Sequence, residues 1–170
     1  MADNNKLNRL ILLALMIALS FVGANIKLPG PFSTIALDSF PAYFAGILMG
    51  GFYGGFVGLM GHLMTSALSG FPFGLPIHGA IALLMFLSVY LFALASKKVH
   101  SILGIIVAIA MNGLVMPVAL VTVPGFEWEM AVVFIPALVV ASAVNVILAV
   151  VINGAVSKTE LARGFKDDDL

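Results

Sequence analysis

Few side chains of this 170-residue sequence can do chemistry, and they stand inside long apolar runs. Asp38 is the only acidic residue within any of these runs, and His62 and His78 lie sixteen positions apart. No acidic cluster lies near the two histidines to complete a metal site. A carboxylate or an imidazole in apolar surroundings needs a hydrogen-bonding partner. These groups therefore indicate either contacts to a ligand or hydrogen bonds within the protein.

Carboxamide and aromatic side chains extend this set. Asn145 lies deep in the last apolar run, where a structural bond and a ligand contact are equally good interpretations. Aromatic rings near the ends of the runs could stack on the ring of a ligand. We take the following residues as candidate substrate contacts: Asn25, Phe32, Asp38, Phe71, Phe73, His78, Asn112 and Trp128.

Several kinds of chemistry are excluded. The sequence has no cysteine, no phosphate-binding loop of the form G-x-x-x-x-G-K-[ST], no H-E-x-x-H and no G-x-S-x-G, which are signatures of thiol, ATPase, zinc-protease and esterase sites. Its net charge is zero, so no basic surface is expected to bind nucleic acid. We therefore expect no catalytic residue, no metal and no cofactor, and a chain that must borrow energy for any transport.

The elements that position these residues follow from the composition. Hydrophobic residues make up 62% of the chain and charged residues 9%, which is too few charges for the surface of a soluble protein. Residues 39–96, 99–126 and 130–157 carry no Asp, Glu, Lys or Arg. With roughly 20 residues needed per membrane span, these runs and the apolar run that ends at Lys27 divide at glycine and proline clusters into six helices. The expected helices are residues 8–27, 35–50, 52–69, 78–96, 100–122 and 130–156.

The basic residues predict the orientation of this all-α, six-span membrane bundle, because lysine and arginine stay on the cytoplasmic side. With both termini inside, seven of the eight basic residues are cytoplasmic and only Lys27 is outside. We expect one transmembrane domain over residues 1–156 and a short cytoplasmic tail over residues 157–170. All eight prolines then fall in the outer half. Irregular backbone in a membrane needs protein or a water-filled cavity around it, so the outer half is expected to hold a cavity.

Small residues mark a second surface. Ala14 and Ala18 share one face of the first helix, and Gly54 and Gly58 share a face of the third. Such spacing lets membrane helices approach each other closely. We interpret these four residues as a docking face for another membrane subunit, with internal packing as the alternative.

Three strings carry a resemblance to a known family: ALMIA at residues 14–18, PFSTIALDSFP at residues 31–41 and MGGFYGG at residues 49–55. Over essentially its whole length the chain resembles the substrate-binding S components of energy-coupling factor (ECF) transporters, which take up vitamins in bacteria. The resemblance implies a pocket on the outer side and location in the plasma membrane. It also implies that the face of Ala14 and Ala18 docks onto a transmembrane coupling subunit carried by two ATPases.

The substrate is less constrained. The region around Asp38, with His62, Phe71 and His78, is most similar to the subgroup associated with α-ribazole, a neutral aromatic nucleoside. Cobalamin, riboflavin and pantothenate stay open as alternatives, although anionic pantothenate would want a basic partner and only Lys27 lies outside. Two other classes of protein are also open: a small intramembrane enzyme that uses Asp38 or a histidine, and a structural membrane subunit without a ligand.

Overall fold

The uncharged runs form helices that end at the glycine and proline clusters, so the prediction of an all-helical architecture is confirmed. The computed structural model describes residues 2–30 and 34–157. Its elements are α1 (Ala2–Asn25), β1 (Lys27–Pro29), β2 (Thr34–Ala36), α2 (Phe40–Met49), α3 (Gly51–Leu68), α4 (Gly74–Lys98), α5 (Ser101–Ala110), η1 (Met111–Val115), α6 (Met116–Leu120) and α7 (Trp128–Val156).

The expected helix over residues 35–50 begins too early. Residues 34–36 form β2, which pairs antiparallel with β1, so that Leu28 faces Ile35. Helix α2 begins only at Phe40, with Pro41 in its first turn, a position where the missing N–H of proline costs no helical bond. The expected helix contained Asp38. In the structure, Asp38 lies instead in the turn between β2 and α2.

The expected helix over residues 100–122 is present but is not regular. Between α5 and α6 the chain forms one π-helical segment, η1, which contains Asn112 and Gly113. Gly113 lies where an added Cβ would meet the backbone and side chain of Val139 in α7. A π-turn changes which residues face the neighbouring helix, and here it accompanies a close contact between η1 and α7.

The glycines of α3 are used inside the protein. Gly54 and Gly58 are buried, and a Cβ on Gly54 would overlap the backbone of Gly46 in α2 and lie 2.9 Å from the carbonyl oxygen of Ala42. A Cβ on Gly58 would lie 3.3 Å from Val89 of α4 and 3.5 Å from Ala42 of α2. Both glycines therefore pack inside the protein, which favours internal packing, the alternative to a docking face. Small residues here let α2 and α3 approach each other closely.

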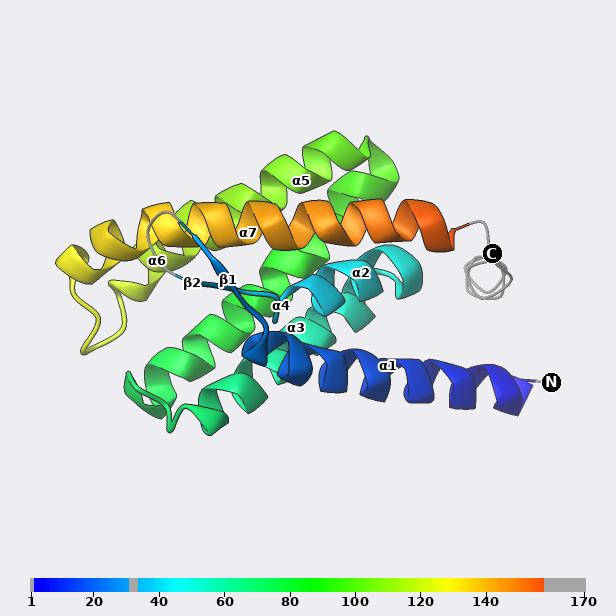
Figure 1. Ribbon diagram of the computed structural model, residues 1–170, viewed down its shortest axis with the longest axis horizontal. Helices are drawn as coiled ribbons and strands as arrows, with labels where there is room; N and C mark the ends of the chain where they lie inside the picture. The colour runs from blue at the N-terminus through cyan, green and yellow to red at the C-terminus, as the bar shows by residue number, and fades with distance from the viewer. Residues whose placement is uncertain (1, 31–33, 158–170) are drawn as a thin grey trace.

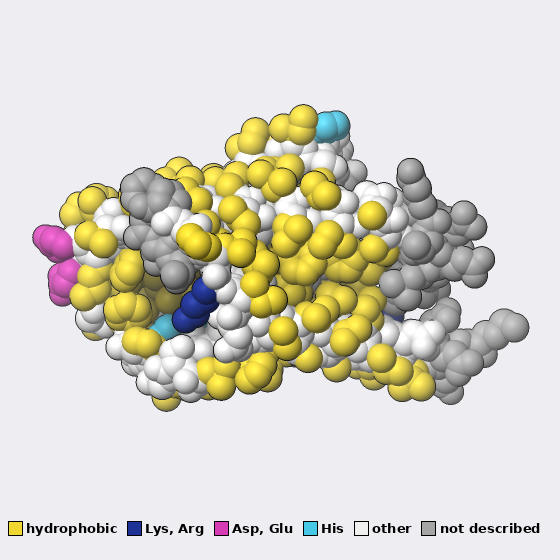
Figure 2. Space-filling view, in the orientation of Figure 1, with side chains coloured by type: hydrophobic (Ala, Val, Ile, Leu, Met, Phe, Trp, Pro, Cys, Tyr) yellow, Lys and Arg dark blue, Asp and Glu magenta, His cyan; other side chains and the backbone are white. Residues whose placement is uncertain are grey.

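Four helices of the described chain are long and apolar enough to cross a membrane: Lys6–Asn25 of α1, α4, the continuous helix Ser101–Leu120, and α7. Their surfaces carry many exposed large hydrophobic side chains. Figure 2 shows that hydrophobic side chains cover the middle of one face, while acidic ones gather at one end. Helix α2 has ten residues and is shorter than a span, so the number of six spans stays a prediction.

The two ends of the bundle differ. Figure 1 shows the hairpin, the α3–α4 turn and the α6–α7 connection toward one end, while α1 begins and α7 ends at the other. The prolines of the described chain lie in the hairpin, the α3–α4 turn, α6 and the α6–α7 connection, or in the first turns of α2, α4 and α7: Pro29, Pro41, Pro72, Pro76, Pro117, Pro124 and Pro136. We call the first of these ends the proline-rich end and the other the terminal end.

Candidate ligand-binding site

A cavity of about 300 Å³ lies among α3, α4, η1, α6 and α7, next to the turn that precedes α2. Its wall is mostly apolar and aromatic, with a few polar side chains, which is the usual make-up of a small-molecule site. Figure 2 shows a histidine side chain in a depression of the surface at the proline-rich end. The lining residues are Asp38, Ser39, Gly58, His62, Phe73, His78, Ile81, Met85, Asn112, Met116, Leu120, Phe126, Phe134, Leu138 and Ala141.

Two histidines and a serine form a hydrogen-bonded cluster in the wall. His62 Nε2 lies 3.2 Å from His78 Nδ1, and Ser66 Oγ lies 3.1 Å from the first nitrogen and 3.0 Å from the second. The imidazole rings stack with centroids 5.3 Å apart. His78 is 6% exposed, and its Nε2 is buried with no protein partner. A buried nitrogen of this kind gains stability from a partner, which a ligand could supply.

Phenylalanine rings form a second part of the wall. Phe73 contacts the ring of His78 at 5.9 Å and the rings of Phe126 and Phe134 at 6.3 and 5.9 Å between centroids. Phe126 and Phe134 are 6.3 Å apart. Phe73 precedes Phe126 and Phe134 by more than fifty positions, and the α3–α4 turn and the α6–α7 connection bring the three rings together. Such a cluster offers faces and edges on which a planar ring can stack.

The π-turn places an amide in the same cavity. Asn112 is 7% exposed, and its Nδ2 donates to Ser142 Oγ of α7 over 2.7 Å. Ser142 is fully buried, so this bond fixes the orientation of the carboxamide. The amide oxygen of Asn112 is then available as a hydrogen-bond acceptor.

Asp38 owes its position to an asparagine that does not line the cavity. Asn145 Nδ2 donates to the carbonyl oxygens of Ala36 and Ala141, both over 2.9 Å, and its Oδ1 accepts from Phe40 N over 2.8 Å. These bonds fasten both sides of the turn around Asp38 to α7. The sequence left open whether Asn145 makes structural bonds or contacts a ligand. Its hydrogen bonds show a structural role.

The end of α1 holds the turn from its other side. Leu37 N donates to the carbonyl oxygen of Gly23 over 3.0 Å. A Cβ at Gly23 would overlap the carbonyl group of Leu37, so only glycine allows this approach.

The structure brings together four of the eight candidate substrate contacts: Asp38, Phe73, His78 and Asn112. The exposed Asn25 donates to the carbonyl oxygen of Phe21 over 3.0 Å and does not line the cavity. Phe71 lies behind His78, with ring centroids 5.7 Å apart. Trp128 is 53% exposed at the start of α7, and Phe32 lies outside the described residues.

Sequence reasoning missed His62, Phe126 and Phe134 as parts of the wall. The sequence shows His62 as a polar residue within an apolar run, but nothing in the spacing of sixteen residues predicts its contact with His78. The one local signal is Ser66, which follows His62 by a single helical turn and bonds to it.

The residues expected to dock a partner lie elsewhere. Ala14 and Ala18 are exposed on α1, whereas Leu12, Met16 and Ser20 form its buried face. The two alanines therefore stand on a side of α1 that the described chain leaves open.

Comparisons with known proteins identify the family of the chain. The family model "ECF transporter, substrate-specific component" matches residues 8–157, which is most of the chain. A solved structure of the S component of a bacterial ECF transporter is similar, with 21% identity and a TM-score of 0.67, over 89% of this chain and 96% of that one. No curated protein matches. The fold, the apolar helices and the family match thus lead to one conclusion: the chain belongs to the family of substrate-specific components of ECF transporters.

Proposed function

We propose that the cavity at the proline-rich end captures a vitamin or vitamin precursor on the outer side of the membrane, and that the ligand is a neutral aromatic molecule such as α-ribazole. The observation that carries the proposal is the wall of the cavity. It sets Asp38, Asn112 and the unpartnered nitrogen of His78 around the same space as the rings of Phe73 and Phe126.

The chemistry of this wall favours a ligand with a flat ring and hydroxyl or amino groups. The phenylalanines offer stacking surfaces, while the carboxylate of Asp38 and the amide oxygen of Asn112 accept hydrogen bonds. No lysine or arginine is among the described residues that line the cavity. These wall residues would give an anion near Asp38 no compensating charge, which is unfavourable in apolar surroundings.

These properties rank the open alternatives. Pantothenate carries a carboxylate and lacks a basic partner in the wall. Cobalamin is much larger than a nucleoside, and a volume of about 300 Å³ lies at the small end of the range for ligand sites. Riboflavin is neutral and aromatic and is therefore the strongest competitor of α-ribazole.

The proposal includes a topology and partners. Six spans with both termini inside put the proline-rich end outside, and the chain then sits in the bacterial plasma membrane. A transmembrane coupling subunit with two ATPases supplies the energy, since the sequence has no ATP-binding loop. Exposed Ala14 and Ala18 supply the surface for docking, because small side chains permit close helix contact.

Mass spectrometry of the purified chain tests the function. We expect one small neutral aromatic molecule per protein to survive purification in mild detergent. Ala141→Phe should abolish its retention, because Ala141 lines the cavity and a phenyl ring there would fill it.

Val133→Phe is the matched control, since Val133 is 71% exposed on the same helix, and its retention should equal that of the wild type. A ligand that survives equally in Ala141→Phe would place binding elsewhere. If the chain bound none of the vitamins and precursors in a screen, the proposed function would be contradicted.

A further inference from the structure

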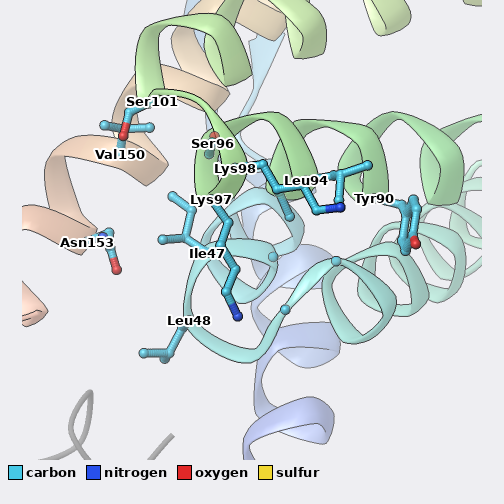
Figure 3. A pocket seen from close by; sticks show the side chains of 14 residues that line it. Ile47, Leu48, Tyr90, Leu94, Ser96, Lys97, Lys98, Ser101, Val150 and Asn153 are labelled. Carbon is cyan, nitrogen blue, oxygen red and sulfur yellow. The ribbon is translucent and has the colours of Figure 1, made fainter. Parts of the chain in front are cut away.

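Two cavities in the described chain differ in the polar atoms that they offer to a ligand. The second, of about 460 Å³, lies at the terminal end among the α2–α3 turn, the end of α4, the start of α5 and the last turns of α7 (Figure 3). Figure 3 shows the amines of Lys97 and Lys98 pointing to different places. The unpartnered hydroxyl of Ser96 packs against α5, where a Cβ on Gly104 would overlap it. In the first cavity, by contrast, the unpartnered atom belongs to a hydrogen-bonded cluster that includes His78.

This cluster of His62, Ser66 and His78 has two possible arrangements of its protons. Ser66 Oγ lies 3.1 Å from His62 Nε2 and 3.0 Å from His78 Nδ1. A neutral imidazole carries a proton on one nitrogen and a lone pair on the other, and a hydroxyl donates one hydrogen bond while it accepts another. The serine can therefore link the two rings in a chain of two hydrogen bonds, and this chain can run in either direction.

The direction of the chain decides what His78 offers to a ligand, because the hydrogen bond at one ring nitrogen sets the tautomer of the ring. If Ser66 donates to His78 Nδ1, the proton of His78 lies on Nε2, which is then a donor. If His78 Nδ1 donates to Ser66 and Ser66 donates to His62 Nε2, the lone pair of His78 lies on Nε2. That nitrogen is then an acceptor.

The burial of the two rings favours the second direction. His78 is 6% exposed, and its Nε2 is buried without a protein partner. His62 is more exposed than His78, and its Nδ1 is not among the buried atoms without a partner in the described chain. Buried N–H groups without a partner are rarer in proteins than buried acceptors without one. The N–H group therefore belongs at His62 Nδ1 and the lone pair at His78 Nε2.

Two more acceptors line the same cavity. They are the carboxylate of Asp38 and the amide oxygen of Asn112, whose Nδ2 is bonded to Ser142. On the basis of the proposed function, we propose that Ser66 and His62 are positioning residues that hold the proton of His78 on Nδ1. His78 Nε2 then accepts a hydrogen bond from a hydroxyl or N–H group of the ligand. The donor groups of the ligand face the three acceptors, and its ring lies against the phenylalanines.

Nitrogen NMR of the full-length chain in detergent micelles tests the direction of the hydrogen bonds without a ligand. The chain has three histidines, and with isotope-labelled imidazoles the chemical shift separates a nitrogen that carries a proton from one that does not. The variants His100→Ser and His78→Phe each remove one ring and so assign the signals. At a pH where the rings are neutral, we expect the proton of His78 on Nδ1 in the wild type. A proton on Nε2 would overturn the proposal.

Variants of the cluster test the role of the two positioning residues. The double variant His62→Leu, Ser66→Ala removes both partners of His78 Nδ1, so we expect the signal of a protonated Nε2 to appear. Ser66→Thr keeps a hydroxyl and should keep the proton on Nδ1. Thr65→Ala is the matched control, because that hydroxyl bonds to the carbonyl oxygen of His62 and not to a ring. An unchanged tautomer in the double variant would show that His62 and Ser66 do not set it.

Titration of the labelled chain with α-ribazole tests the bond to the ligand. We expect the His78 Nε2 signal to shift on binding while the proton stays on Nδ1. A proton that moves to Nε2 on binding would overturn the proposal, because His78 would then be a donor. If neither α-ribazole nor riboflavin bound while the proton stayed on Nδ1, the proposed function and the ligand bond would be contradicted. The tautomer would still support the role of His62 and Ser66.

Discussion

Asp38, His78 and Asn112 meet in one cavity although 74 positions separate the first from the last. Their polarity within apolar runs marks them in the sequence, since a membrane protein keeps such groups where they have partners. The direction in which a side chain faces around its helix could not be predicted from the sequence. Asn25 and Trp128, two of the candidate contacts, therefore lie outside the cavity.

The roles of Asn145 and His62 show the same limit. Each stands in an apolar run, and the sequence leaves open whether it binds a ligand or another protein group. The answer depends on residues far along the chain: Ala36 and Phe40 for Asn145, and His78 for His62. Such pairings follow from helix packing, which one sequence without an alignment does not determine.

Replacement of Asn145 should loosen the turn that holds Asp38. In Asn145→Ala, the amide of Phe40 and the carbonyl of Ala36 lose their partner, and each buried group without one costs about 1–3 kcal/mol. We expect the Tm in detergent to fall by about 2–4 °C per kcal/mol and ligand affinity to fall with it.

Asn153→Ala is the matched control, an asparagine two turns further along α7 that lines the other cavity. Thermal unfolding followed by fluorescence measures both variants. Equal melting temperatures for Asn145→Ala and the wild type would show that these bonds do not hold the turn.

Loss of the imidazole at position 78 should weaken binding without unfolding the protein. His78→Phe keeps a ring among Phe71 and Phe73 but removes Nε2, which has no protein partner. It also removes Nδ1, whose partners His62 and Ser66 keep the bond between them. One hydrogen bond to the ligand is worth about 0.5–1.5 kcal/mol, so we expect affinity to fall by up to about tenfold.

The third histidine provides the control for that measurement. His100 caps α5 by accepting from Ile102 N, and His100→Ser retains a capping side chain. Calorimetric titration should give wild-type affinity for His100→Ser. Unchanged affinity in His78→Phe would remove this nitrogen from the site.

At the scale of elements, the main helices could be predicted from uncharged runs and their glycine and proline ends. The hairpin could not, because each strand has only three residues, too few for an alternating pattern to be recognised. The π-turn at residues 111–115 has no local signature either. The π-turn lines the cavity through Asn112, and the hairpin leads into the turn with Asp38. Each is bonded to a residue of α7 that is distant in sequence.

Two helical glycines, Gly54 of α3 and Gly79 of α4, provide a matched test of how closely α2 and α3 pack. Gly54→Ala places a methyl group against the backbone of α2, which cannot move aside as a side chain can, and overpacking typically costs about 1–3 kcal/mol. We expect a lower Tm in detergent for this variant.

Gly79→Ala is the comparison, because nothing lies within 4 Å of a Cβ there and alanine favours a helix over glycine by about 0.5–1 kcal/mol. Its Tm should stay equal or rise. A Tm for Gly54→Ala as high as that of Gly79→Ala would contradict the close α2–α3 contact.

Substitutions on the exposed face of α1 should impair transport without impairing ligand binding. The double variant Ala14→Trp, Ala18→Trp adds bulk to an exposed face and leaves the buried face with Leu12 and Met16 unchanged. We expect ligand binding by the isolated chain to persist and uptake by cells with the complete transporter to be lost, because the helices can no longer approach closely.

Bulk added to another exposed face is the control. Leu83 and Leu87 of α4 are 65% and 42% exposed and four positions apart, so Leu83→Trp with Leu87→Trp should spare uptake. Normal uptake in the Ala14 and Ala18 variant would remove the docking proposal.

At the scale of the whole molecule, the distribution of charges and prolines predicts two unlike ends, and the structure has them. The proline-rich end holds the hairpin and the cavity with Asp38, and the terminal end holds the second cavity with Lys97 and Lys98. Family membership, expected from three short strings, is confirmed by the family match over residues 8–157. The identity of the substrate depends on the shape of a cavity that five elements form together. The composition of the chain does not predict that shape.

Calorimetric titration of the purified chain tests most directly whether the cavity at the proline-rich end binds a neutral aromatic vitamin precursor, as we propose. With α-ribazole, riboflavin, pantothenate and cobalamin as titrants, we predict saturable binding at one site per chain for α-ribazole and no heat of binding for pantothenate or cobalamin. Preferential binding of pantothenate, or no binding of any of the four, would contradict the account.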